Sequence, residues 1–565
     1  MEKPAPSPPH RRLAGRLVRL AALLSPRAAA PAATVAALLP LTAVLFSPAA
    51  RAQDAAIDIP DTTLAVTYRQ AAEKNILAAV NPAVFSGYFS VAADGRKFGY
   101  GYTYPSLDGH QMSDALLWLN RADVVRANWD YVRSYQREDG LLPLAIYPGQ
   151  GGKDIGPKGY PAIVAPNGGL YVHWVPGNPL EALASPTYIQ NADVIYRATL
   201  DTAWLIAQLP SINRAADFLA SLMAPDGAVR GGGYYVERPP RLDEDGVTQC
   251  YAVDAFTIAA SLNGVAGKDA AVSRYNGLAA RIRDHFVTRC WAGDHFIEYV
   301  NPGHGAVANH GLTDVDWAAI ATGVATPEQV RILWPQLRDE ERFHYGGMPT
   351  GIATHPEKYE AWEFSYDRHD LASMGRVWYL EAWARARMGD AAGLLAGLRR
   401  VSQAGRDSGY YWRERYVPDG KGGATGIGPG TYCEYPANLI RITQRFLLGV
   451  DLQLDGTVVI APTVTPGFWD SGFGETLSWR DRSLCYRMCR DTLRGRYRGK
   501  ASQRVGARFS GTAEGYTAAA SVSGTPLDVQ RVRDVFFVVL PPAPGGEGCT
   551  FSLWREPHAG NTKAR

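Results

Sequence analysis

The stretch "MSDALLWLNRADVVRANWDYVRSYQREDG", residues 112–140, decides the fold class of this chain. Its apolar residues recur at helical spacing and predict one helix over 111–120 and a second over 122–137. The link between them is very short, and Gly140 ends the second helix. Two helices joined by so short a link form an antiparallel hairpin, so the stretch predicts helix packed on helix.

The chain up to about residue 450 repeats this hairpin. Apolar periodicity predicts twelve helices, with Pro210 among the residues that separate them. We expect these helices over 62–80, 111–120, 122–137, 187–207, 210–224, 248–264, 268–290, 314–322, 327–337, 367–388, 391–405 and 434–448. Short links alternate with long ones, and a long link precedes each even-numbered helix. This rhythm predicts a mainly α fold, an (α/α)6 barrel whose even helices line the inside under six long loops.

The character of the sequence changes after about residue 450. Short alternating runs such as "LQLDGTVVIAPTV" and "VRDVFFVVLPP" lie between Gly and Pro turns and predict strands. We expect a small C-terminal antiparallel β domain over 450–555, a barrel domain over 53–449 and a frayed tail over 556–565.

The N-terminal segment has the features of an export signal. An Arg-, Pro- and Ala-rich region precedes the apolar run "ATVAALLPLTAVLF" (33–46), and the A-x-A pattern Ala50-Arg51-Ala52 follows. This order predicts a bacterial signal peptide over 1–52 and a periplasmic or secreted protein. A membrane anchor is the alternative, but Pro40 breaks the run and the run is short for a membrane span.

Charge and cysteine content narrow the possible partners. Residues 1–52 hold seven of the 58 basic residues and one of the 55 acidic ones, so the remaining chain carries 51 basic and 54 acidic residues. The sequence of the remaining chain has no basic stripe of the kind that indicates nucleic-acid binding. The six cysteines follow no zinc spacing, and we expect no metal and no cofactor.

The long loops share a polar and aromatic composition that suits carbohydrate. Helix caps explain residues such as Ser185, Thr187, Thr248 and Thr313. They do not explain the aromatic side chains beside carboxylates and amides, for example in "YEAWEFSYDRHD" (359–370). The C–H face of a sugar packs on an aromatic ring and its hydroxyls take the hydrogen bonds. The loops therefore predict an oligo- or polysaccharide ligand.

Two carboxyl groups flank the bond that a glycoside hydrolase cleaves. One donates a proton, and the other activates water or attacks the sugar. Loops around one crevice can supply such a pair from distant parts of the chain.

Several stretches resemble six-hairpin glycosidases. Residues 107–148, "LDGHQMSDALLWLNRADVVRANWDYVRSYQREDGLLPLAIYP", are similar to the acidic region of bacterial α-L-rhamnosidases. "DGVTQCYAVDAFTIAASLNG" (245–264) resembles the middle of this superfamily, which includes amylo-α-1,6-glucosidases. "GATGIGPGTYCEYPAN" (423–438) is similar to the turn where the rhamnosidases place a catalytic-base Glu, and "LDGTVVIAPTV" (454–464) to the entry of their β-domain.

The resemblance implies a glycoside hydrolase acting on a rhamnoside- or α-glucoside-like substrate. It matches Asp108 to the acid of the first turn, Glu434 to the base and Asp114 to an Asp of the helix start. From the residues themselves, Asp108 and Glu434 are expected just outside inner helices, and Ser113 or Asp114 as a helix cap. Glu363 is a competing catalytic candidate, because Arg368 and His369 can orient it.

The remaining candidates are polar and aromatic residues of the loops that can contact the sugar. They are His110, Gln111, Asp114, Trp174, Tyr188, Glu237, Arg238, Gln249, His310, Trp362, Tyr366, His369 and Tyr432. Two other functions stay open. A polysaccharide lyase on a similar toroid would use a Tyr or His base, and a non-catalytic barrel would only bind sugar.

Overall fold

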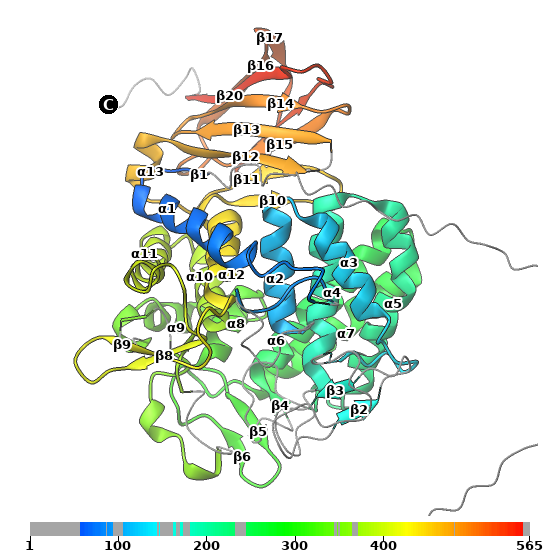
Figure 1. Ribbon diagram of the computed structural model, residues 1–565, viewed down its shortest axis with the longest axis vertical. Coiled ribbons are helices and arrows are strands. Elements are labelled where there is room, and N and C mark those ends of the chain that lie inside the picture. The colour runs from blue at the N-terminus through cyan, green and yellow to red at the C-terminus, as the bar shows by residue number, and fades with distance from the viewer. Residues whose placement is uncertain are drawn as a thin grey trace, which may run out of the picture. The chain divides into compact units, whose positions relative to one another are not determined.

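The computed structural model describes residues 57–85, 87–93, 106–143, 146, 162–164, 170–172, 181–231, 244–343, 347–348, 351–363, 371–479 and 481–557. The predicted signal and the tail beyond 557 lie outside these residues. The described chain is mainly α-helical up to Leu447 and mainly β-stranded after it, as the sequence predicts (Figure 1).

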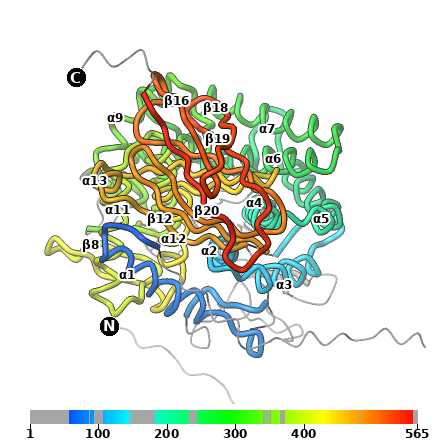
Figure 2. Tube along the Cα trace, turned by 90° about the horizontal axis from the view of Figure 1, so that it is seen from above, coloured from blue at the N-terminus to red at the C-terminus, as the bar shows by residue number. Residues whose placement is uncertain are grey.

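The helical part consists of inner helices that alternate along the chain with outer ones. The inner helices are α2 (Leu107–Trp118), α4 (Glu181–Thr199), α6 (Gly246–Val265), α8 (Asp314–Ala321), α10 (Gly375–Met388) and α12 (Glu434–Ile442). The outer helices are α1 (Thr62–Ala71), α3 (Ala122–Arg133), α5 (Thr202–Ser221), α7 (Asp269–Arg289), α9 (Pro327–Leu337) and α11 (Ala391–Asp407). Each inner helix contacts the next, and α12 contacts α2, so the described inner helices close into a ring (Figures 1 and 2).

Local signals start most of these helices. Asp201 and Asp245 accept backbone hydrogen bonds at the starts of α5 and α6. Thr313 and Thr326 form capping boxes at the starts of α8 and α9, as the sequence predicts for Thr313. π-helical turns extend α1 over Ala72–Ile76 and α12 over Thr443–Leu447.

Four predictions about helix boundaries are wrong. Ser185 and Thr187 do not cap α4, because both lie inside it, where the Thr187 hydroxyl donates to backbone carbonyls. The cap of α6 is Asp245 rather than Thr248. Pro210 lies inside α5 instead of separating two helices. The chain breaks earlier, at Leu200, whose φ of 48° is left-handed. α2 begins at Leu107, so Ser113 and Asp114 do not cap it.

Short strands precede several inner helices. β2 (Ala162–Val164) pairs with β3 (Leu170–Val172) ahead of α4. β4 (Glu244–Asp245), β5 (Tyr299–Asn301) and β6 (Gly305–Val307) form a sheet at the entry to α6. β7 (Ser373–Met374), β8 (Arg415–Pro418) and β9 (Ala424–Ile427) form another at the entries to α10 and α12. The β4-β5-β6 sheet and the β7-β8-β9 sheet each connect one long loop to the next.

The C-terminal strands form two sheets, one of which also includes β1 from the beginning of the described chain. The seven-stranded sheet has the order β1-β12-β13-β14-β20-β16-β17, and the five-stranded sheet has the order β10-β11-β15-β19-β18. Pairing is antiparallel except between β11 and β15. The bounds are β1 (Ile57–Asp58), β10 (Val450–Leu452), β11 (Val458–Ile460), β12 (Phe473–Trp479), β13 (Arg482–Met488), β14 (Thr492–Arg498), β15 (Gln503–Ala507), β16 (Tyr516–Val522), β17 (Thr525–Leu527), β18 (Val529–Val532), β19 (Val535–Leu540) and β20 (Cys549–Pro557), and a short helix, α13, covers Pro466–Ser471.

A buried polar contact joins these strands to the helices. The Gln444 amide donates to the Tyr68 hydroxyl at 2.9 Å and to the Glu475 carboxyl of β12 at 2.7 Å. The six cysteines are all free. Among the described helices, none combines the length and apolar character that a membrane span requires.

Candidate active site

The N-termini of α2, α10 and α12 meet at a pair of carboxyl groups. Asp108 is the second residue of α2 and Glu434 is the first of α12, so both lie in first helical turns rather than outside the helices as predicted. Both are buried. The approach of α10 is close, because a Cβ at Gly375 would stand 3.0 Å from Cγ of Glu434 and 3.1 Å from the backbone N of Tyr435.

Arg376 holds the Glu434 carboxylate in place. Its Nε and Nη2 donate to Glu434 at 3.0 and 3.1 Å, and its backbone N–H donates to Oε1. Oε1 therefore accepts two of these bonds and Oε2 one, which leaves Oε2 able to accept a further hydrogen bond from water. Glu414 also lies near this guanidinium, 4.0 Å from Nη2.

Asp108 has an unusual protonation equilibrium. Burial raises its pKa to about 7, and Glu434 and Glu414 add to this, while Arg376 and a hydrogen bond with Tyr432 oppose it. Desolvation and nearby negative charge both disfavour the ionised form. Its Oδ1 has no hydrogen-bond partner among the described residues. Near neutral pH, Asp108 can therefore hold a proton while it lies beside Glu434, whose carboxyl group Arg376 binds.

A second polar group lies deeper in the ring. Asp114 pairs with Arg441 at 2.8 Å and with Arg445 at 2.7 Å. Burial alone would raise the pKa of Asp114, but the two guanidiniums hold it well below its usual range. His110 lies 3.3 Å from Asn191 and from Arg441, and burial lowers the pKa of its imidazole to about 3. The imidazole is therefore neutral and poorly suited as a base at neutral pH.

His110, Asp114, Arg441 and Arg445 line a cavity in the middle of the ring. Its volume is about 400 Å³, and it extends from Leu107 and Arg376 at the helix N-termini to Asp451 in β10. Gln111, which also accepts a hydrogen bond from Asn438 at 2.8 Å, lies on its wall. Polar cavities of this size hold water or small polar ligands.

Glu363 belongs to a different cluster. Its carboxylate accepts hydrogen bonds from the Tyr299 hydroxyl and from the backbone N–H of Glu360, and it lies 3.3 Å from Nε2 of His310. Burial alone would raise its pKa, but these partners lower it below its usual value. Glu298 contacts the other ring nitrogen of His310. Glu363 is therefore ionised at neutral pH, which does not suit a proton donor.

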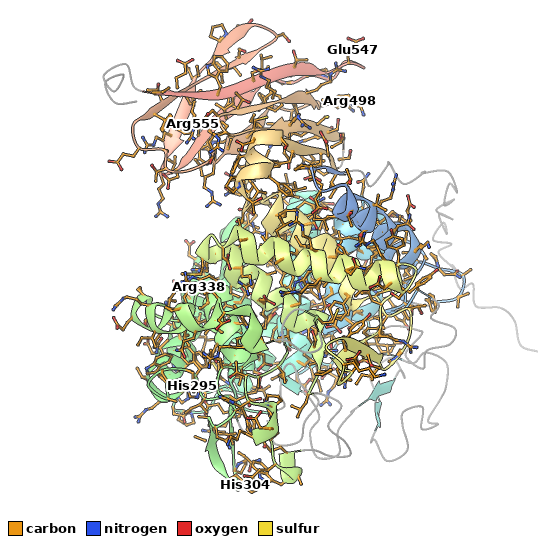
Figure 3. All side chains as sticks on the ribbon, turned by 90° about the vertical axis from the view of Figure 1, so that its left-hand side faces the viewer. His295, His304, Arg338, Arg498, Glu547 and Arg555 are labelled. Carbon is orange, nitrogen blue, oxygen red and sulfur yellow. The ribbon has the colours of Figure 1, made fainter. Side chains whose placement is uncertain are left out.

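Trp362 lies at the rim of this cluster. Its ring stacks on His304 with centroids 3.6 Å apart, and both line a hollow of about 240 Å³ with Glu363. Figure 3 shows His304 at the edge of the helical part, beside β6. An aromatic face at such a hollow is the arrangement that the sequence predicts for a sugar contact.

Two predicted contacts have structural partners instead. The Tyr188 ring stacks on Trp129 of α3 with ring centroids 3.9 Å apart, and its hydroxyl contacts the Ser211 hydroxyl of α5. Its side chain therefore faces the outer helices. Gln249 exchanges hydrogen bonds with the backbone of Val229, which ties the start of α6 to an earlier turn. Five candidates lie outside the described residues: Trp174, Glu237, Arg238, Tyr366 and His369.

The sequence reasoning missed the arginines. Arg376 was expected well inside a helix over 367–388, whereas α10 begins at Gly375 and places it in the first turn. Arg441 and Arg445 stand four residues apart in "LIRITQRFLL" (439–448), and that spacing was a signal for an acidic partner.

Neither a protein-family profile nor a curated protein sequence matches the chain. Its structure is similar to a GH78 family rhamnosidase of Bacillus sp. GL1, with a TM-score of 0.56 and 12% identity over 79% of this chain and 40% of that one. The α-L-rhamnosidase of Streptomyces avermitilis, complexed with L-rhamnose, gives a TM-score of 0.53 and 13% identity over 88% of this chain and 42% of that one. A sialidase gives a TM-score of 0.54 and 12% identity over 77% of this chain and 38% of that one.

The chain thus spans about two fifths of the length of these proteins. The resemblance to rhamnosidases predicted from the sequence is confirmed as a likeness of fold: this chain shares its fold with GH78 α-L-rhamnosidases.

Proposed function

We propose that the chain is a glycoside hydrolase in which Asp108 is the general acid and Glu434 the base. One observation carries the proposal: a buried aspartate with a pKa of about 7 stands beside a glutamate that Arg376 holds by three hydrogen bonds. Environments that favour the proton on one carboxyl group and not on its neighbour define acid and base in such pairs.

The chemistry follows from these two groups. The protonated Asp108 donates to the glycosidic oxygen as the bond to the sugar breaks, and its unpaired Oδ1 is available for that contact. Glu434 accepts a proton from the attacking water through the free acceptor site of Oε2. Arg376 keeps the carboxylate of Glu434 oriented throughout the reaction.

The substrate is a rhamnoside- or α-glucoside-like oligosaccharide in this proposal. The shared fold with α-L-rhamnosidases supports it, as do the stacked Trp362 and His304 at the hollow beside Glu363. The proposal further includes an (α/α)6 barrel as the catalytic domain, supported by the closed ring of inner helices, and export through residues 1–52.

The test compares Asp108→Asn and Glu434→Gln with wild type on aryl α-L-rhamnosides and aryl α-D-glucosides. General acid–base catalysis is worth about 10²–10⁴-fold in rate, so each variant should lose activity of that order. Asp108→Asn should lose less on a substrate with an acidic phenol as leaving group, because that group departs without protonation. Glu475→Gln is the matched control, since burial also raises the pKa of Glu475 to about 7, away from the pair.

Two results would refute the assignment. In the first, both variants keep wild-type activity on every glycoside that the wild type cleaves. In the second, the product is an unsaturated sugar that absorbs ultraviolet light, which would identify a lyase.

A further inference from the structure

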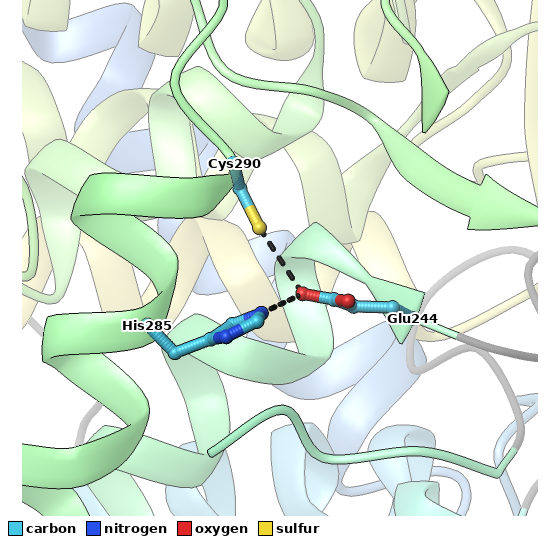
Figure 4. Close-up of side chains that lie close together, drawn as sticks. All are labelled: Glu244, His285 and Cys290. Carbon is cyan, nitrogen blue, oxygen red and sulfur yellow. Dashed lines mark hydrogen bonds and ion pairs between the residues drawn. The ribbon is translucent and has the colours of Figure 1, made fainter. Parts of the chain in front are cut away.

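A buried Glu–His–Cys cluster lies at the entry to α6, outside the carboxyl pair. Glu244 of β4 accepts hydrogen bonds on Oε1 from Nε2 of His285 at 2.6 Å and from Sγ of Cys290 at 3.1 Å (Figure 4). The three ligand atoms lie within 4.8 Å of one another, and all three residues are buried. His285 and Cys290 come from the end of α7 and the residue after it.

The arrangement is unlike that of a cysteine nucleophile. In a catalytic triad the imidazole stands between the thiol and the acid, because it must take the proton of the thiol. Here the carboxylate stands between the other two groups, and the Cys290 thiol donates to Glu244. The three groups therefore converge on one point rather than forming a relay.

Convergent sulfur, nitrogen and oxygen donors are the ligand set of zinc. Zn²⁺ binds thiolate at about 2.3 Å, imidazole at about 2.0–2.1 Å and carboxylate at about 2.0–2.2 Å. Ligand atoms at those distances stand about 3.5 Å apart around a tetrahedral ion. At present, Nε2 of His285 lies 2.6 Å and Sγ of Cys290 lies 3.1 Å from Oε1 of Glu244, and a proton bridges each pair. A zinc ion in place of these protons would require the three side chains to move apart by about 1 Å or less.

The orientation of His285 fits a ligand role. Its Nε2 lies 2.6 Å from Oε1 of Glu244, and the backbone of Asp226 lies close to the ring. Histidine ligands are commonly fixed in this way, with one nitrogen toward the metal and the other bonded to a backbone carbonyl or carboxylate.

We propose that Glu244, His285 and Cys290 bind one Zn²⁺, with water in the fourth position. Binding releases the thiol proton of Cys290 and the proton shared by His285 and Glu244 to solvent, and involves no redox step. The proposal departs from the sequence expectation of no metal. That expectation rested on residue spacing, and Glu244 lies 41 residues before His285 in the chain, outside any common zinc spacing.

The ion would secure the sheet at the entry to α6. β4 pairs with β5, and the N–H of Gly246 donates to the carbonyl of Glu298 at 3.0 Å. Glu298 and Tyr299 in turn contact His310 and Glu363. A zinc ion at Glu244 would thus link the end of α7, through β4 and β5, to the cluster that contains Glu363.

The first experiment measures bound metal. The full chain is incubated with zinc, desalted and analysed by atomic emission. Wild type should retain about one zinc per chain, and Cys290→Ser and His285→Gln should lose it. Cys250→Ser, which alters a buried free cysteine of α6, should retain it. Absence of zinc in wild type, or equal zinc in all variants, overturns the proposal.

The second experiment needs no change at the site. Cobalt(II) is added to the full chain after the cysteines of the C-terminal strands, Cys485, Cys489 and Cys549, are replaced by serine. A sulfur-to-cobalt charge-transfer band with the visible bands of a tetrahedral ion is expected. If cobalt binds without the charge-transfer band, or does not bind, the assignment fails even where Cys290→Ser does not fold.

Discussion

The ionisation of Asp108 should lower the stability of the protein as the pH rises from 3.8 to about 7, and Asp108→Asn should remove that effect. Folding raises the pKa of this carboxyl from 3.8 to about 7. Between these two values the folded chain keeps the proton that the unfolded chain releases. The free energy of unfolding therefore falls as pH rises through this window and levels off above about 7.

The size of the effect follows from the same values. A change of one in pKa corresponds to about 1.4 kcal/mol. The whole change from 3.8 to about 7 therefore corresponds to about 4 kcal/mol. The loss of unfolding free energy amounts to about 1.5 kcal/mol at pH 5 and reaches its full value by about pH 8. The difference in unfolding free energy between Asp108→Asn and wild type should therefore shift by about 2–3 kcal/mol in favour of the variant between these two pH values.

Guanidinium unfolding at pH 5 and pH 8, followed by tryptophan fluorescence, measures this shift. Comparing the two pH values cancels the fixed cost of exchanging a carboxyl for an amide. Asp123→Asn is the control, because the pKa of Asp123 lies below its usual value and its contribution is constant over this range. An Asp108→Asn difference that is the same at both pH values would refute the reasoning, even if the variant were inactive.

Three further changes probe the same region. Asp114→Asn leaves two buried or half-buried guanidiniums without their carboxylate and should cost about 3–5 kcal/mol, measured as a lower guanidinium midpoint; an unchanged midpoint would contradict the ion pairing. Tyr432→Phe removes a hydrogen bond that lowers the pKa of Asp108, so the alkaline limb of the pH–rate profile should move to higher pH, and a move to lower pH would count against it. Gly375→Ala places a methyl group 3.0 Å from Glu434 and should lower kcat/KM by about 10–100-fold in a protein with a native circular dichroism spectrum; full activity would show that the position of the carboxylate is not critical.

The predicted helices agree with the structure best where one face of the helix is apolar. α7 and α11 pack one face on the inner layer and begin and end within about two residues of their predicted bounds. α2 was predicted to begin at 111, although it begins at Leu107. Its first turns are buried on all sides and carry Asp108, His110 and Gln111, so the apolar period that marks an outer helix is missing there.

The candidate site was predictable in part for a similar reason. Asp108 and Glu434 were predicted from the resemblance to rhamnosidases, and the hairpin rhythm places each of them near the start of an inner helix, where the structure has them. Arg376 was missed because an error of eight residues in the start of α10 moved it from the first turn to the helix interior. Tyr188 was misassigned because its sequence position does not show that its ring turns toward Trp129 of an outer helix.

The closed ring also sets the order in which the site can be assembled. Asp114 and its partners Arg441 and Arg445 are separated by more than 300 residues, and the same contact between α2 and α12 brings Asp108 beside Glu434. Contacts of such long sequence separation form late and slowly, because the intervening chain must first be organised. During synthesis, Asp114 of α2 must wait without its two arginine partners until α12 and the turn after it leave the ribosome. A nascent chain that stops before Glu434 therefore has five inner helices and an open seam, and the acid acquires its partner only in the last step of ring closure.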